Sequence, residues 1–192
     1  MTDDGPRRRS RRTKCLEVEP EGGDSFTFTA SLLDESFHGD YEVPGDSRII
    51  HHFGISGRIN GNDLHLTALD VEAKTHPFPQ CPFIIPASMD LIGHSLMSGW
   101  RRRVLDRLGG SAGCTHVTTL LLGLSEVTTL IYFQRMNRTA TYGPDSRASG
   151  EWIGASLDFA PQLGGACHAL APEGAVIRQA ERFRSGRDTP AT

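Results

Sequence analysis

The sequence lacks the long apolar stretches that mark membrane spans and secretory signals. No stretch reaches the roughly 18 apolar residues needed to cross a bilayer. The arginine-rich start leads into Cys15-Leu16-Glu17-Val18-Glu19-Pro20 rather than into the apolar region of a signal peptide. We therefore expect a cytoplasmic protein with no membrane partner, in which the four cysteines are reduced.

The sequence also lacks the short motifs of the common cofactor enzymes. It contains no Gly-x-Gly-x-x-Gly, Gly-x-x-x-x-Gly-Lys-Ser/Thr or His-Glu-x-x-His segment. Enzymes that bind ATP, nicotinamide or flavin in the usual ways are disfavoured, and no nucleotide or flavin cofactor is expected. The formal net charge of −3 argues against a nucleic-acid partner.

Charge and periodicity divide the chain into three parts. Six basic residues lie near the start: Arg7, Arg8, Arg9, Arg11, Arg12 and Lys14. We predict a disordered basic arm over residues 1–14, a single α+β domain over residues 15–182, and a disordered tail over residues 183–192. At this length, one ordinary domain with a substantial core is expected.

Hydrophobic spacing predicts the elements of that domain. Alternation of apolar and polar residues predicts a strand over 26–33, and two further runs, 48–59 and 63–74, predict a hairpin around Asn60-Gly61-Asn62. Helical spacing predicts helices over 88–96, 99–108 and 114–135. The expected fold is an antiparallel β meander packed against two or three helices, with strand edges that would allow a homodimer.

The most informative segment is Gly113-Cys114-Thr115-His116, which follows a glycine-rich turn and opens the predicted helix over 114–135. Free N–H groups and the helix dipole stabilise a thiolate at such a position. Cys114 is therefore a candidate nucleophile. His116 lies in the same first turn, so its ring and the sulfur need not face each other, and we expect His51 or His168 to be the partner of the thiol. Alternatively, Thr115 and the free amides bind an anion while the histidines transfer protons, or Cys114 and Thr115 only cap and pack the helix.

Other cysteines and histidines extend this candidate site. Cys81 lies in a loop stiffened by three prolines, and His51 shares a predicted strand face with apolar residues. Cys167-His168 is a second Gly-led Cys-His pair. A tentative metal set consists of Cys81, Cys114, His116, Cys167 and His168, and zinc is the metal that suits these ligands. No Cys-x-x-Cys pair is present, so the spacing differs from that of zinc ribbons and fingers.

The order of several segments resembles the bacterial DUF2889 family, a domain of unknown function. The resemblance covers roughly residues 8–180, and Gly-Cys-Thr-His is its most specific part. The segments that carry it are Arg11-Arg12-Thr13, Leu33-Asp34, His51, Pro77-Phe78-Pro79-Gln80-Cys81, Gly99-Trp100, Gly113-Cys114-Thr115-His116 and Cys167-His168-Ala169. The resemblance implies a site formed by His51, Cys81, Cys114, His116, Cys167 and His168, and it implies no particular reaction.

These observations lead to two hypotheses of function. The first is a small-molecule enzyme of bacterial catabolism, of the lyase, decarboxylase or hydrolase type, that acts on a carbonyl- or carboxylate-bearing substrate. Its catalytic residues would be His51, Cys114, Thr115 and His116. The second is a non-enzymatic module whose Cys/His cluster binds a structural metal or ligand.

Overall fold

A computed structural model describes residues 9–37 and 48–187. The chain divides into two compact units, Met1–Leu130 and Ile131–Thr192, and each is described below by itself. The first unit contains a sheet with helices, and the described part of the second is helical. The chain thus has the predicted α+β class.

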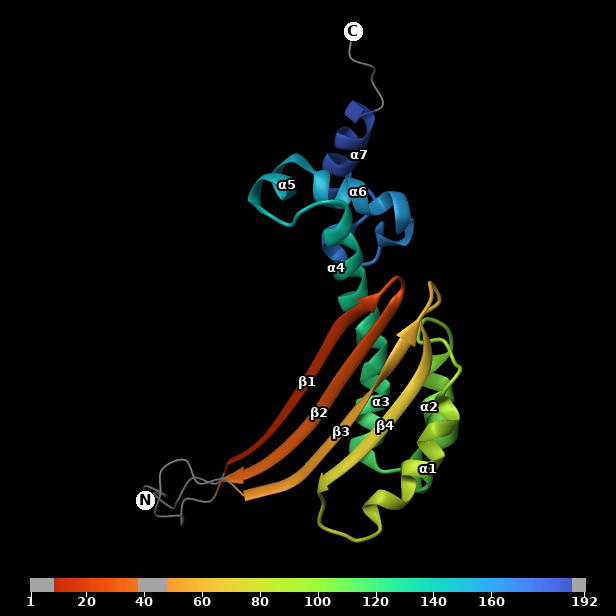
Figure 1. Cartoon of the computed structure of the whole chain (residues 1–192). Coiled ribbons are helices and arrows are strands. Elements are labelled where there is room, and N and C mark those ends of the chain that lie inside the picture. Colours follow the sequence, from red (N-terminus) through yellow and green to blue (C-terminus); the bar gives the residue numbers. More distant parts are fainter. Residues whose placement is uncertain (1–8, 38–47, 188–192) are drawn as a thin grey trace, which may run out of the picture. The chain divides into compact units, whose positions relative to one another are not determined.

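Four antiparallel strands in sequence order form the sheet of the first unit (Figure 1). They are β1 (Arg9–Gly22), β2 (Ser25–Phe37), β3 (Arg48–Asn60) and β4 (His65–Thr75). Alternate residues of β2, from Phe26 to Leu32, are buried beneath the helices. The hairpin predicted over 48–74 is confirmed as β3 and β4, which agree with the meander expected from the alternating pattern.

The prediction of a disordered arm is wrong for residues 9–14, which form the first half of β1. Their backbone pairs with β2 from Arg9 opposite Phe37 onwards. Arg11 and Arg12 form ion pairs with Glu35 and Asp34 on β2, so this run of positive charge is partly neutralised within the sheet. Residues 1–8 lie outside the described residues.

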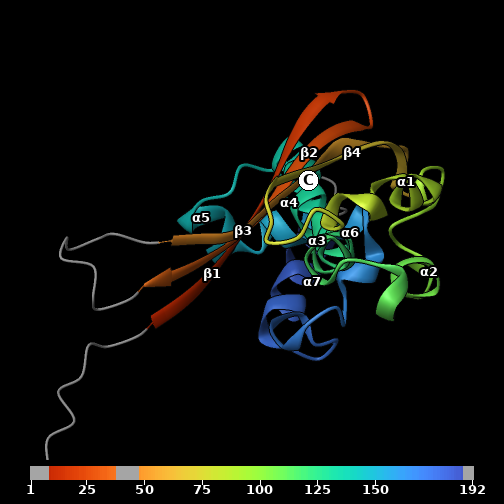
Figure 2. The same cartoon turned by 90° about the horizontal axis from the view of Figure 1, so that it is seen from below.

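Helices cover one face of the sheet in the first unit (Figures 1 and 2). The helical segments after β4 are η1 (Cys81–Ile84), α1 (Ile85–Ser88), η2 (Met89–Leu91), α2 (Trp100–Leu108), η3 (Gly110–Ala112), α3 (Thr115–Gly123) and η4 (Leu124–Glu126). The indole N–H of Trp100 donates to the Leu121 carbonyl at 2.7 Å, which joins α2 to α3. The predicted helix over 99–108 is confirmed by α2.

The predicted helix over 88–96 ends early, at Leu91. Residues 93–96 instead pair with the start of β4, through the bonds from Gly93 N to Leu66 O at 2.7 Å and from Leu96 N to Leu64 O at 3.0 Å. These bonds satisfy backbone groups at the β4 edge, and tertiary pairing therefore replaces the local helical preference.

The helix predicted over 114–135 is observed as α3, η4 and α4 (Val127–Thr139), with a tighter turn between the two α-helices. The run Thr115–Thr139 is long and apolar enough, by length and composition, to cross a membrane. This finding differs from the expectation that no stretch of the chain is long and apolar enough to cross a bilayer. In the first unit, the buried residues of α3 are Val117, Leu120 and Leu121, and 39% of the apolar window of this run is buried.

The second unit has a small core of its own. The described part of this unit consists of the end of α4, α5 (Pro144–Ser149), α6 (Glu151–Phe159), η5 (Pro161–Leu163), η6 (His168–Leu170) and α7 (Ala175–Arg187). The core is formed by Met136, Ile153, Leu157, Ile177 and Ala180. The single α+β domain predicted over 15–182 thus contains residues of two compact units.

The predicted tail over 183–192 is also corrected in part. Residues 183–187 continue α7, and Arg184 on that helix pairs with Asp158 of α6 at 3.0 Å. The charged, apolar-poor end of the sequence indicated disorder, but the helix continues from the buried residues before it. Residues 188–192 lie outside the described residues.

Candidate functional site

Three adjacent strands place a row of polar side chains on the helix-covered face of the sheet. Arg12 of β1 lies opposite Asp34 of β2, and Asp34 lies opposite His51 of β3. Directly opposed residues of antiparallel strands point to the same face, so the strand register brings these three side chains together. The pairing of β2 with β3 shifts immediately after Asp34, at a bulge.

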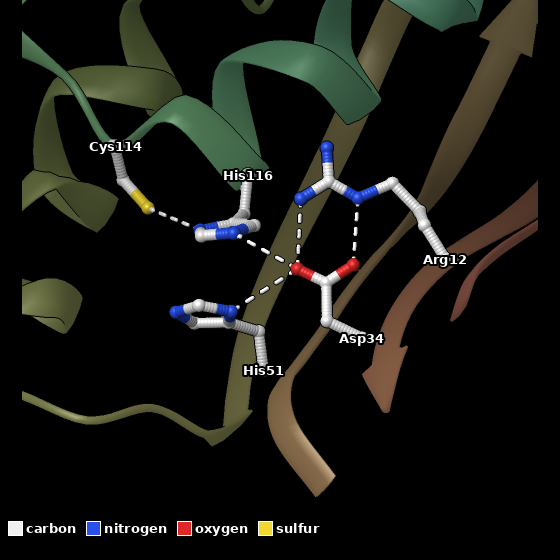
Figure 3. Close-up of polar contacts among 5 residues, drawn as sticks. All are labelled: Arg12, Asp34, His51, Cys114 and His116. Atoms are coloured by element: carbon white, nitrogen blue, oxygen red, sulfur yellow. Dashed lines mark hydrogen bonds and ion pairs between the residues drawn. The ribbon is translucent and has the colours of Figure 1, made fainter. Parts of the chain in front are cut away.

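Arg12 holds the Asp34 carboxylate with two bonds. Its Nε donates to Oδ1 at 2.6 Å and its second guanidinium nitrogen donates to Oδ2 at 2.7 Å (Figure 3). Such a two-point pair fixes the orientation of the carboxylate. Hydrogen bonding from Arg12 is the main cause that lowers the pKa of Asp34, and His51 and His116 lower it further. Asp34 is therefore ionised at neutral pH.

His116 approaches the same carboxylate from the first turn of α3. Its Nε2 lies 3.2 Å from Asp34 Oδ2, and His51 Nδ1 lies 3.1 Å from the same oxygen. The centroids of the two imidazole rings are 3.9 Å apart. The ring of Phe53 stacks on that of His116, with 5.3 Å between their centroids. His51 and Phe53 thus share one face of β3, as the alternating pattern predicted.

Burial lowers the pKa of His116, and the neighbouring His51 lowers it further, against the opposing effect of Asp34. At neutral pH His116 is therefore uncharged. A neutral imidazole has one N–H and one lone pair. The carboxylate favours the hydrogen on Nε2, which leaves the lone pair on Nδ1.

Cys114 precedes α3 as its N-cap residue, with no side-chain capping bond. Its Sγ lies 3.7 Å from His116 Nδ1, so the thiol faces the nitrogen that has the lone pair (Figure 3). The first backbone N–H groups of a helix have no partner within it. Those of α3 begin at the residues directly after Cys114, where the positive end of the helix dipole also lies.

The result is a continuous chain of polar contacts from Cys114 through His116 to Asp34 and Arg12. It has the parts of an activated thiol: a nucleophile, a base within reach, and a carboxylate that orients the base. A pocket of about 480 Å³ adjoins the Arg12–Asp34–His51 row. Its lining residues are Ser10, Arg11, Arg12, Asp34, Glu35, Ser36, Ile50 and His51.

The same side chains also form a group with metal-ligand character. One ligand atom each from Asp34, His51 and His116 lies within 4.8 Å of the other two. Among residues 9–37 and 48–187, no other group of three or more His, Cys, Asp or Glu side chains lies close enough to hold a metal ion. Two imidazoles and a carboxylate are a common donor set for divalent transition metals.

Of the predicted catalytic residues, His51, Cys114 and His116 meet in this site. Thr115 begins α3 beside them, and it is exposed. Their catalytic roles remain predictions.

Of the predicted metal ligands, Cys81 is half-buried in η1 and lies outside the metal-ligand group. Cys167 and His168 are exposed and belong to the second unit. Of the predicted set, the group that the structure does form contains His116 alone, together with Asp34 and His51.

Sequence reasoning missed Arg12 and Asp34 as site residues. Arg12 was assigned to the basic arm and Asp34 to the end of a strand. The available signal was alternation in β2 and β3, where Asp34 and His51 are in phase with the buried residues; Arg12 follows only once the register of β1 is known.

The glycine-rich turn before Cys114 contains a further motif, but the structure around it is not the one that the motif requires. Gly109-Gly110-Ser111-Ala112-Gly113 has the Gly-x-Ser-x-Gly spacing of a nucleophile elbow. That motif needs a sharp turn from a strand into a helix, whereas Ser111 is exposed in η3 after α2. Ser111 is therefore not a candidate nucleophile.

Comparison with known proteins identifies a family and no function. The model of a family described as "Protein of unknown function (DUF2889)" matches residues 8–130. The match ends where the first compact unit ends, so Cys167 and His168 lie beyond it. Neither a curated protein nor a solved structure matches the chain.

Proposed function

Because the chain belongs to the DUF2889 family, whose description assigns no function, we propose a function from the geometry of the site. The protein is an enzyme of bacterial catabolism that acts on a small molecule with a carbonyl or carboxylate group. Cys114 is the nucleophile, His116 is the general base, and Asp34 orients His116. The reaction is of the hydrolase, lyase or decarboxylase type.

One observation carries this proposal: the contacts from Cys114 Sγ to His116 Nδ1 at 3.7 Å and from His116 Nε2 to Asp34 Oδ2 at 3.2 Å. In the hydrolytic form of the reaction, the thiol proton moves to His116 Nδ1 as the sulfur attacks the carbonyl carbon. His116 then returns the proton to the leaving group, and water cleaves the resulting thioester. The lowered pKa of His116 supports this role, because a base must be uncharged to accept the proton.

The surroundings of the thiol support attack at a carbonyl. The first backbone N–H groups of α3 are donors for the negative charge that develops on the carbonyl oxygen. His51 is a second proton carrier at the same carboxylate, beside the pocket that adjoins the row.

We also propose that the protein works in the cytoplasm. All four cysteines are free thiols. A thiol nucleophile must stay reduced to act, and the cytoplasm keeps thiols in that state.

The experiment is acylation of the full chain by p-nitrophenyl acetate, a small activated carbonyl compound. We expect a burst of p-nitrophenolate and one acetyl group on Cys114, located by peptide mass spectrometry. Cys114→Ser should abolish the burst, and Cys81→Ser, the matched thiol control, should keep it. His116→Asn should slow the burst by about 100-fold, the usual size of a general-base contribution. Acetylation spread evenly over the four cysteines would contradict the proposal.

A second candidate function is a module that binds a divalent metal at Asp34, His51 and His116. The observation in its favour is the convergence of their three ligand atoms within 4.8 Å. Zinc accepts imidazole nitrogen and carboxylate oxygen at about 2.0–2.2 Å, so a small inward movement of the side chains would complete three bonds. Metal on His116 Nε2 would leave Nδ1–H to donate to Cys114, and His116 would no longer be its base.

Calorimetric titration of the full chain with zinc separates the two functions. A structural module should bind one zinc tightly, lose that binding in His51→Ala and keep it in His168→Ala, a matched control in the second unit. Absence of zinc binding together with acetylation of Cys114 would favour the enzyme. Zinc binding that survives His51→Ala would exclude this ligand set.

A further inference from the structure

The second histidine of the site, His51, has one ring nitrogen without a partner. Its Nδ1 lies 3.1 Å from Asp34 Oδ2. Its Nε2 forms no hydrogen bond or ion pair within residues 9–37 and 48–187. Figure 3 shows this nitrogen pointing away from Asp34, toward the side of the site on which the sulfur of Cys114 lies. The side chain is 21% exposed, so the ring is open to water.

The carboxylate of Asp34 determines which nitrogen of His51 carries the hydrogen. A neutral imidazole has one N–H and one lone pair. Because Asp34 is ionised, the neutral ring of His51 turns the N–H of Nδ1 to Oδ2 and keeps the lone pair on Nε2. Each of the two histidines therefore donates to Asp34 and has a basic nitrogen on its other side. The basic nitrogen of His116 faces the thiol, whereas that of His51 is free to bind a water molecule.

We propose that the enzyme is a hydrolase in which His51 is the general base of the second step, an inference that rests on the proposed function. In that step a water molecule attacks the carbonyl carbon of the thioester on Cys114, and His51 Nε2 takes a proton from the water. The bond from carbon to sulfur then breaks and the carboxylic acid leaves. The proton held by His51 returns to the departing sulfur, which restores the thiol.

The positions of the two rings suit this division of work. Their centroids are 3.9 Å apart, so both bases lie close to the same thioester. His116 is less accessible to water, because its side chain is 15% exposed and the buried ring of Phe53 stacks on it. Its Nδ1 also faces the sulfur, at 3.7 Å. A second base that is open to water favours hydrolysis over the lyase and decarboxylase types, which need no activated water.

The burst assay with p-nitrophenyl acetate separates the two steps, because acylation gives the burst and hydrolysis of the thioester gives the steady rate. His51→Asn keeps an amide N–H for Asp34 but has no basic nitrogen. We expect its burst to stay near one per chain and its steady rate to fall about 100-fold, as for loss of a general base. His52→Asn is the matched control, since the next residue of β3 points to the opposite face of the sheet. It should keep both phases.

Mass spectrometry of the stalled variant is the second measurement. The His51→Asn chain should accumulate one acetyl group on Cys114, and hydroxylamine, which cleaves thioesters without help from a protein base, should remove it. His51→Gln should stall in the same way, and it replaces His51→Asn if that variant does not fold.

The outcomes distinguish this inference from the proposed function. A parent chain without a burst would reject the thiol chemistry and the role of His51 with it. A burst in the parent chain together with an unchanged steady rate in His51→Asn and His51→Gln would overturn the role of His51 alone. Loss of the burst in folded His51→Asn would also overturn it, because His51 would then act in the first step.

Discussion

At the scale of single residues, Asp34 determines the geometry of the site. Its Oδ2 lies within 3.2 Å of nitrogen atoms from Arg12, His51 and His116. Arg12 balances its charge and fixes its plane, so the carboxylate presents one oxygen to both imidazoles. The orientation of each histidine therefore depends on a residue that lies outside the Gly-Cys-Thr-His motif.

Substitution of Asp34 by asparagine should destabilise the protein. The change keeps the shape but removes the charge that accepts two bonds from Arg12, which should cost about 1–3 kcal/mol in the free energy of unfolding. Urea denaturation measures this. Glu72→Gln is the matched control, because the exposed Glu72–Lys74 pair should contribute less than about 1 kcal/mol. If the two substitutions lowered the free energy of unfolding equally, the Arg12–Asp34 pair would contribute no more to stability than an exposed ion pair does.

The lowered pKa of His116 predicts how stability depends on pH. In the unfolded chain His116 binds its proton near its ordinary pKa of 6.5, whereas in the folded chain it does so only at lower pH. Acidification below about pH 6.5 therefore favours the unfolded chain. Asp34 acts at lower pH, because its stabilising charge is lost as the pH falls through its lowered pKa.

His116→Gln isolates the histidine contribution. Melting temperatures of this variant should fall less steeply between pH 7 and pH 5 than those of the parent chain. His168→Gln, which changes an exposed histidine in the second unit, should keep the parent slope. An unchanged slope in His116→Gln would mean that the folded chain does not resist protonation of His116.

Cys114 and His116 were identified as candidates because the preceding glycines mark a helix start. Their contact was not predicted, since residues two apart in a helix need not face each other, and His51 or His168 was the expected partner of the thiol. Arg12 and Asp34 are 22 residues apart and polar, and nothing local connects them. Their pairing depends on strand register, which the whole sheet determines.

At the scale of elements, the start of α3 depends on Gly113. A Cβ at this position would lie 2.1 Å from the carbonyl oxygen of Leu108, where backbone atoms leave no space. The chain can therefore fold back from α2 to place Cys114 at the helix start only with glycine here. This gives the first residue of the Gly-Cys-Thr-His motif a steric reason.

Gly113→Ala should accordingly lower the free energy of unfolding by about 1–3 kcal/mol, the usual cost of overpacking. Gly123→Ala in α3 is the control, because a Cβ there meets nothing within 4 Å and alanine favours the helix. The control should be neutral or stabilising by up to about 1 kcal/mol. Circular dichroism during urea denaturation measures both. A neutral Gly113→Ala would show that the turn has room to move.

The elements were predictable to different extents for physical reasons. β3, β4 and α2 each bury one side, so their apolar spacing was visible in the sequence. β1 is an edge strand exposed on nearly all its residues, and it carries no alternating pattern. It forms because β2 supplies its hydrogen-bond partners, which is a tertiary effect.

At the scale of the whole molecule, the family match and the first unit end at the same residue, 130. Arg12, Asp34, His51, Cys114 and His116 all lie within the matched range. The second unit contributes a separate core and lies beyond the match. The division of the chain is therefore consistent with a site that belongs to the first unit alone.

Leu157→Ala tests whether the units are energetically separate. Truncation of this buried leucine should cost the second unit roughly 2–4 kcal/mol. Hydrogen exchange should then accelerate in α6 and α7, with little change in β2 and β3. Leu121→Ala in the first core should produce the reverse pattern. Equal acceleration in both units after either substitution would mean that the chain unfolds as one cooperative body.

The row formed by Arg12, Asp34 and His51 also makes the site sensitive to misfolding. A slip of β1 by a single residue that brought Thr13 opposite Asp34 would turn Arg12 to the opposite face of the sheet and leave Asp34 without its cation. The carboxylate would then lose its fixed plane, and the histidines their shared acceptor. In the proposed enzyme, a molecule paired in this wrong register would lack the oriented base, so Cys114 would gain its reactivity only after the strands had paired correctly.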